Sequence, residues 1–192
     1  EYMLKYPEFK RVVFQNDQLL NAATFTGNVG PVKLLLKFPE GRQLLKISEP
    51  SLGYNILHSM LEYYPNGEVM QAILDCGEEG RELFLMQDND GRVPLLLALH
   101  SNRYQVESLN NLLEAFLQYE EARESLKIAD AEHRTCLHYL AAKEYTMSLN
   151  NVLQFEQSKE IINAKDKKGN TPLYYALDRN RKTANILLRN GA

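Results

Sequence analysis

The chain has 192 residues, a formal net charge of −3 and a sequence pI near 5.9. This charge balance gives no electrostatic case for direct binding to nucleic acid, which needs a clustered basic face. No apolar run reaches the roughly 18 residues that span a bilayer, and two cysteines, Cys76 and Cys136, are too few and too far apart for a disulfide framework or a zinc site.

The first half of the chain predicts helices separated by turn signals. Residues 4–10 resemble residues 36–42, so residues 1–12 are expected to be the tail of a preceding repeat or an N-terminal cap. An outer helix near 30–37 carries Pro31 in its first turn, where proline is tolerated. Pro65 and Gly67 then separate two further apolar helical stretches.

The second half carries the clearest signals. Residues 103–117 form an amphipathic pattern that predicts a long helix. Residues 166–176, DKKGNTPLYYA, read as a tight turn that leads into a helix. Gly169 supplies the positive φ of the turn, Thr171 is a plausible N-cap, and Pro172 takes the first helical position.

The same turn and helix recur along the chain. Equivalent leucines, at positions 20, 57, 95, 137 and 173, are 37, 38, 42 and 36 residues apart. The third and fourth copies carry DNDGRVPL and TCLH at the places of DKKGNTPL and TPLY. This pattern resembles the ankyrin repeat, whose Asp-x-x-Gly-x-Thr-Pro-Leu-His-x-Ala consensus recurs about every 33 residues. A second signature, Gly41-Arg42 in its first copy, follows each outer helix with an apolar pair and accounts for the longer period.

The resemblance implies an all-α fold, an ankyrin-repeat solenoid of stacked helix-turn-helix units with short β-hairpin-like loops. It covers residues 1–192 as a single domain. The expected repeats are approximately 13–48, 49–86, 87–128, 129–164 and 165–192. In this family pattern His138 takes the structural histidine position that bridges neighbouring loops. Asn163 lies where some ankyrin proteins are hydroxylated, and its alternative role is a hydrogen bond in a turn.

No catalytic or metal-binding arrangement stands out. Asp88-Asn89-Asp90-Gly91 resembles the start of a calcium loop, but Leu99 stands where an EF-hand requires its bidentate glutamate, which favours a plain turn. Cys136 and His138 are two residues apart and therefore point to different sides of a helix. Without a nucleophile, base and orienting group, we expect no catalytic residues, no metal, no cofactor and no enzyme activity.

The resemblance implies that a partner protein binds the concave surface formed by inner helices and loop tips. Tyrosine and arginine are enriched in binding hot spots. The expected protein-binding residues are Phe25, Tyr54, Glu62, Tyr63, Asp90, Arg92, His100, Arg134, Lys143, Lys167, Lys168 and Arg179. They give an aromatic N-terminal half and a basic C-terminal half, suited to a partner with an acidic or amphipathic segment.

The expected function is therefore a protein–protein interaction module that acts as a scaffold, adaptor or inhibitor. The alternative is a targeting or regulatory ankyrin domain of a larger enzyme, channel or bacterial effector whose activity lies outside this chain. We expect a monomeric domain without direct nucleic-acid binding or membrane insertion. Reduced cysteines indicate an intracellular location, in the cytoplasm, the nucleus or both.

Overall fold

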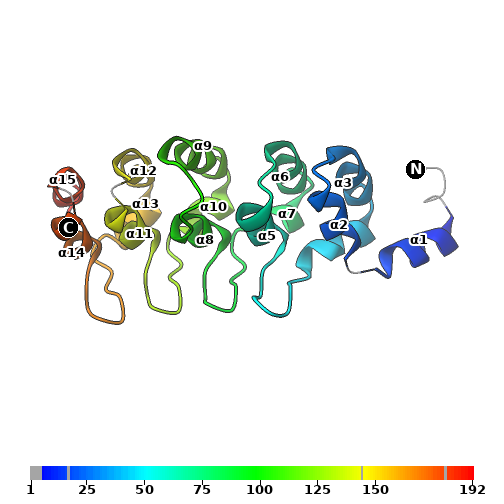
Figure 1. Cartoon of the computed structure of the whole chain (residues 1–192), viewed down its shortest axis with the longest axis horizontal. Coiled ribbons are helices and arrows are strands. Elements are labelled where there is room, and N and C mark those ends of the chain that lie inside the picture. The colour runs from blue at the N-terminus through cyan, green and yellow to red at the C-terminus, as the bar shows by residue number, and fades with distance from the viewer. Residues whose placement is uncertain (1–5, 17, 144, 180) are drawn as a thin grey trace. The chain divides into compact units, whose positions relative to one another are not determined.

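The structure, a computed structural model, describes residues 6–16, 18–143, 145–179 and 181–192. Over these residues the chain is helical and contains no strand, which confirms the expected all-α class (Figure 1). It divides into two compact units, Glu1–Met86 (unit 1) and Gln87–Ala192 (unit 2), at the border between the second and third expected repeats. Each helix in the described part of the chain is too short or too polar to cross a membrane.

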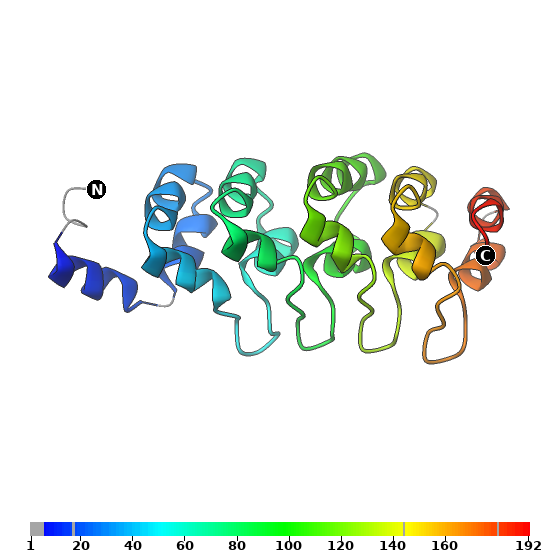
Figure 2. The same ribbon diagram turned by 180° about the vertical axis from the view of Figure 1, so that it is seen from behind.

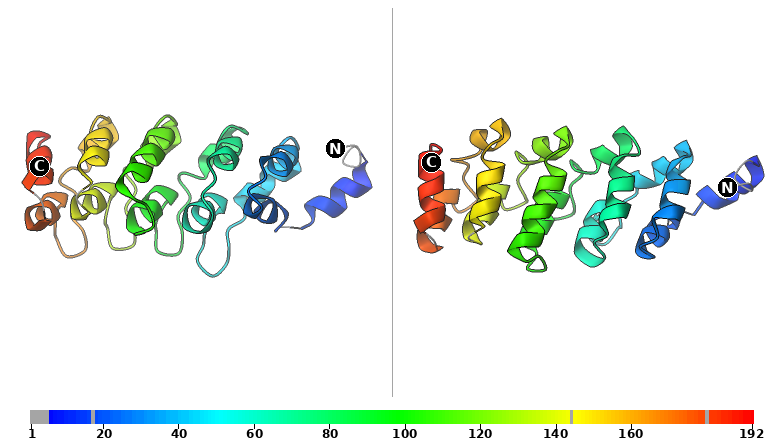
Figure 3. Two further views of the ribbon diagram at one scale, coloured as in Figure 1. Left: turned by 45° about the horizontal axis from the view of Figure 1, so that its top comes forward. Right: turned by 90° about the horizontal axis from the view of Figure 1, so that it is seen from above.

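Unit 2 repeats one order of elements: an inner helix, an outer helix, a short third helix and a loop. The inner helices are α8 (Pro94–His100), α11 (Cys136–Ala142) and α14 (Pro172–Arg179), the outer helices are α9 (Val106–Phe116), α12 (Thr146–Val152) and α15 (Arg181–Arg189), and the short helices are α10 (Glu120–Ser125) and α13 (Glu156–Glu160). Inner and outer helices form two rows in Figure 1, and the outer helices run side by side when seen from above (Figure 3). Helix α11 packs against α8 and α14, and α12 packs against α9 and α15.

Leucine side chains between these helices form the core of unit 2. Leu96 and Leu99 of α8, Leu137 and Leu140 of α11, and Leu113 of α9 are fully buried in one hydrophobic cluster. Burying such a side chain contributes roughly 1.5–3 kcal/mol relative to leaving it exposed. The core therefore holds each helix pair against its neighbour and fixes where the loops between them begin and end.

Unit 1 is built in the same way. Its elements are α1 (Pro7–Phe14), α2 (Leu19–Phe25), α3 (Val29–Leu36), α4 (Pro39–Gln43), a 3-10 turn η2 (Leu44–Lys46), α5 (Ile56–Tyr63), α6 (Gly67–Leu74) and α7 (Glu78–Glu82). The inner helices α2 and α5 pack together, and so do the outer helices α3 and α6. Buried Leu20, Val32, Leu57, Val69 and Ile73 fill the space between them. Of the segment expected to precede the first repeat, residues 1–5 lie outside the described residues and α1 occupies most of the remainder.

The signature expected after each outer helix forms a short helix rather than an irregular extension. Figure 2 shows α10 and α13 in front of the inner helices of unit 2. The apolar pairs that follow these short helices are buried, as in Leu83 with Phe84 and Ile161 with Ile162. These pairs close the core at the side where the loops leave the helices.

Each short helix also carries one small, buried residue next to the end of the preceding outer helix. These residues are Gly41, Gly80, Ala122 and Ser158. The Ser158 hydroxyl donates to the Val152 carbonyl at 2.7 Å. At Gly41 and Gly80 even a Cβ atom would overlap a carbonyl oxygen of the outer helix, so the glycines set how closely these two short helices approach it.

Local capping explains where several helices begin. Asn28, Asn55 and Asn66 precede α3, α5 and α6, and the side chain of each accepts a hydrogen bond from a first-turn amide. Pro94 and Pro172 occupy the first positions of α8 and α14. The long helix expected from residue 103 begins only at Val106, in α9.

Candidate functional site

Three loops of unit 2 share one internal framework, built around the buried carboxylates of Asp88, Asp130 and Asp166. In each loop the aspartate Oδ1 accepts hydrogen bonds at 2.8–2.9 Å from the amides two and four residues later. The aspartate N–H donates to the carbonyl four residues later, which closes the turn. The carboxylate therefore replaces water as the partner of the loop backbone and fixes its shape.

The second oxygen of each carboxylate also has a partner. The Tyr139 hydroxyl donates to Asp130 at 2.5 Å and the Tyr175 hydroxyl donates to Asp166 at 2.6 Å. Arg92 Nε donates to Asp88 at 2.9 Å. Burial alone would raise the pKa of Asp130 and Asp166, but these hydrogen bonds, with those from the loop amides, outweigh it and hold both pKa values below their ordinary range.

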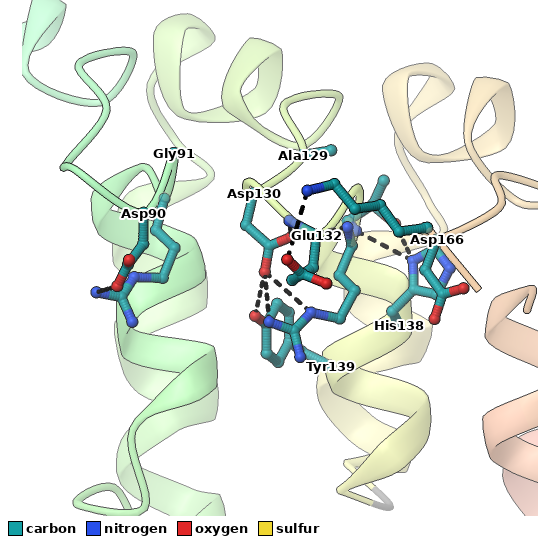
Figure 4. A network of polar contacts seen from close by, with 12 residues as sticks. Asp90, Gly91, Ala129, Asp130, Glu132, His138, Tyr139 and Asp166 are labelled. Carbon is teal, nitrogen blue, oxygen red and sulfur yellow. Dashed lines mark hydrogen bonds and ion pairs between the residues drawn. The ribbon is translucent and has the colours of Figure 1, made fainter. Parts of the chain in front are cut away.

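Neighbouring loops are joined to one another through their backbones at the tips. The Ala131 amide donates to the Asp90 carbonyl at 2.8 Å, and the Lys167 amide donates to the Glu132 carbonyl at 3.0 Å. Figure 4 shows the side chains around these contacts, with an exposed ion pair between Lys167 and Glu132 at 3.5 Å. Because the backbone carries these links, the side chains at the tips do not have to.

His138 ties the base of one loop to the base of the next. Its Nδ1 accepts from the Thr135 amide at 3.0 Å, so the ring proton must lie on Nε2. Nε2 then donates to the Asn170 carbonyl at 3.2 Å. Burial lowers the pKa of His138, which favours this neutral form. The bridging role expected for His138 is confirmed (Figure 4).

The expected binding residues at the loop tips divide into two groups. Asp90, Lys167 and Lys168 are exposed. Arg92 instead pairs with Asp88 and Asp90, at 2.9 and 2.6 Å, and only 13% of its side chain is exposed. Arg134 bonds Asp130 at 3.0 Å and lies over the ring of Tyr139. The two arginines thus hold the loops, and their expected contact with a partner stays a prediction.

Of the aromatic residues expected to bind a partner in unit 1, two are exposed and one is buried. Phe25 and Tyr63 are 71% and 54% exposed, and Glu62 is half-buried. Tyr54 is only 7% exposed, since its ring stacks on His58 with a centroid distance of 5.5 Å. The expectation that Tyr54 offers a docking surface is therefore wrong: the residue follows the loop glycine directly and turns inward.

Of the expected binding residues on or next to the inner helices of unit 2, one makes an internal contact and two are exposed. Lys143 Nζ donates to the carbonyls of His100 and Ser101, at 2.8 and 2.7 Å, and so caps the C-terminal end of α8. This contact gives Lys143 a structural role, and its expected contact with a partner stays a prediction. His100 is exposed and meets Tyr139 edge to face, and Arg179 is exposed beside Asp178.

The structure leaves Asp90, Lys167 and Lys168 exposed on the loops of unit 2, where the 130–134 loop lies between Asp90 and the two lysines. In unit 1 it leaves Phe25 and Tyr63 exposed on the inner helices. Sequence reasoning missed the tyrosines that hold the loop aspartates. Their signal was present, because a tyrosine follows the aspartate by nine residues in both 130–139 and 166–175.

Cys136, a metal site and Asn163 are the remaining chemical possibilities that the sequence raised. Burial raises the pKa of the Cys136 thiol to about 12, so it does not ionise near neutral pH and cannot act as a thiolate nucleophile. Across the described parts of the chain no three His, Cys, Asp or Glu side chains lie close enough to hold a metal ion. The Asn163 side-chain amide donates to the Gly191 carbonyl at 3.0 Å, a contact 28 residues away in sequence and not the hydrogen bond within a turn that was the alternative role.

Comparison with known proteins gives no relative. No protein-family model matches the sequence, and no curated protein matches it significantly.

Proposed function

We propose that this chain is an ankyrin-repeat module that binds a partner protein through the side formed by its inner helices and loop tips. The repeated order of inner helix, outer helix and loop supports the assignment, as do prolines at the first position of two inner helices. The free cysteines Cys76 and Cys136 fit an intracellular, reducing location. In this proposal the module acts by binding and performs no catalysis of its own.

One observation carries the proposal: the loop tips of unit 2 are rigid in their backbone but exposed in their side chains. Their amides and carbonyls bond to each other across loops, while Asp90, Glu132, Lys167 and Lys168 reach the surface. A preorganised backbone reduces the ordering cost of binding, and exposed polar side chains supply specificity. The adjacent lysines favour a partner segment that carries acidic residues.

The test is affinity capture with matched charge reversals. A Lys167→Glu/Lys168→Glu variant changes the loop tips, and an Arg181→Glu/Arg189→Glu variant makes the same charge change on exposed positions of α15. Circular dichroism first checks that both variants keep the helical content and melting temperature of the parent.

The loop variant should lose a captured partner that the parent and the α15 variant retain. Mutation of a charge at the rim of an interface mainly slows association and changes its salt dependence, so the loss should be larger at low salt. Equal capture by all three proteins would contradict the proposed surface.

A further inference from the structure

Unit 2 has two adjoining hollows on the side of its outer helices, away from the loop tips. The first, with a volume of about 330 Å³, lies between the C-terminal ends of α9 and α12. The second, of about 480 Å³, lies between the beginnings of α10 and α13. Both are lined by Gln154 and Phe155, so they adjoin, and we call the two hollows together the outer groove. Figure 2 shows the four helices that border it.

The floor of the first hollow is apolar and held in place. Leu117 is buried beneath the first hollow, and half-buried Phe155 separates the two hollows. The Phe155 amide donates to the Val152 carbonyl at 3.1 Å, and its own carbonyl accepts from Ser158. The guanidinium of Arg123 lies 5.9 Å from the centre of the Phe155 ring. A side chain that enters the first hollow therefore meets a fixed apolar surface.

The rim of the outer groove is acidic. Glu114 borders the first hollow, and Glu120 and Glu156 border the second, against a single basic lining residue, Arg123. Glu156 also pairs with Lys159 at 2.6 Å, but both side chains are largely exposed and such pairs hold weakly. The groove as a whole attracts positive charge.

Unit 1 has an equivalent hollow with a different charge. It lies between α3 and α6, has a volume of about 690 Å³, and carries Lys33 and Lys37 on one rim with Glu68 and Asp75 on the other. Its charges balance, so a hollow of this kind follows from the way outer helices pack, whereas the rim of the outer groove is acidic. This difference indicates which kind of segment the groove in unit 2 selects.

We propose that the outer groove docks a short basic segment of a partner protein. An aliphatic side chain of the segment fills the first hollow over Leu117 and Phe155, and a lysine or arginine close to it in sequence pairs with Glu120 and Glu156 in the second. Grooves of this kind combine an apolar anchor with a few charged contacts that fix orientation. This surface is separate from the loop tips, so the module can hold two partners at once.

The probe is a pool of fluorescein-labelled eight-residue peptides that contain leucine or isoleucine two positions from arginine or lysine. A matched pool carries glutamate in place of the basic residue. Binding is measured by fluorescence anisotropy with the whole chain. A Glu120→Gln/Glu156→Gln variant removes the acidic rim, and a Glu107→Gln/Glu160→Gln variant removes the same charge from exposed positions of α9 and α13 that do not line the groove.

The basic pool should bind and the acidic pool should not. The rim variant should weaken binding about fivefold or more, and the control variant by less than about twofold. A Phe155→Leu variant should weaken the binding of peptides selected for a large aliphatic anchor without loss of the melting transition. Absence of binding by the basic pool, equal binding of the two pools, or equal loss in the two variants would overturn the proposal. So would sedimentation that shows two copies of the chain joined through this groove.

Discussion

A single methyl group at Gly80 is predicted to destabilise unit 1. A Cβ atom at this position of α7 would overlap the Ile73 carbonyl oxygen and lie 2.9 Å from the Ile73 carbonyl carbon, where ordinary contact begins at 3.4 Å. Both neighbours are backbone atoms, which cannot rotate away. Overpacking of this kind costs about 1–3 kcal/mol. Alanine in a helix recovers roughly 0.5–1 kcal/mol relative to glycine. Gly80→Ala should therefore lower the free energy of unfolding by about 1–2 kcal/mol.

The matched control is Gly67→Ala in α6, because a Cβ there meets nothing within 4 Å. This variant should be neutral or slightly stabilising, so the two variants should differ by about 1–3 kcal/mol. At roughly 2–4 °C per kcal/mol for a chain of this size, thermal melts followed by circular dichroism should separate them by at least about 2 °C. Ala122 occupies the equivalent place in unit 2, so a shift of the backbone can make room for a methyl group there. If α7 shifts in the same way, the loss of stability in Gly80→Ala lies at the lower end of the range. Melting temperatures within about a degree of each other would refute the close approach of α7 to α6.

Three further predictions concern the loops of unit 2. Gly91→Ala should lower the free energy of unfolding, measured by urea denaturation, by about 1–2 kcal/mol more than Gly169→Ala. Both glycines have positive φ, but of the two only Gly91 would place a Cβ against a neighbouring backbone, 2.9 Å from the Ala131 amide. Equal losses would contradict the contact between the loop tips. His133 has φ of 60°, so His133→Gly should raise the free energy of unfolding by roughly 0.5–1 kcal/mol, and a lower melting temperature would argue against this conformation. Burial lowers the pKa of His138 below its ordinary 6.5, so the unfolded chain binds more protons and the free energy of unfolding should fall as the pH drops below about 6.5. Thermal melts between pH 7.5 and 5.5 should show a smaller loss of stability for His138→Asn than for the parent. An unchanged loss would place the titration elsewhere, with His100 as the next group to test because burial lowers its pKa too.

Local turn and helix signals predicted much of the fold because their chemistry is short-range. Pro172 at a helix start and Gly169 in a turn need only their immediate neighbours to act. The loop of residues 130–134 keeps the same turn without glycine, because His133 takes the positive φ. The hydrogen bonds of Asp130 compensate for the conformational strain. Such a substitution weakens the sequence motif but leaves the loop intact.

The candidate site was less predictable, because exposure depends on contacts between distant residues. Arg92 and Arg134 look like contact residues in a sequence, yet each pairs with the buried aspartate four residues before it. Lys143 caps a helix that lies some 40 residues earlier in the chain. The short helices escaped notice since four or five polar residues carry too little periodic signal. The lysines at the tip of the last loop are exposed, as expected, because the backbone bonds of the loop do not need their side chains, and their role in binding stays a prediction.

The loops of unit 2 contain residues that the structure requires, such as the buried aspartates, and tip residues whose side chains the structure does not require. The contacts from Ala131 to Asp90 and from Lys167 to Glu132 use only amides and carbonyls, so any residue compatible with the backbone can stand at these four positions. A combinatorial library that randomises them while Asp88, Asp130 and Asp166 stay fixed should therefore yield mostly folded members. The loops thus form a scaffold on which new recognition can evolve, or be selected in the laboratory, without rebuilding the core.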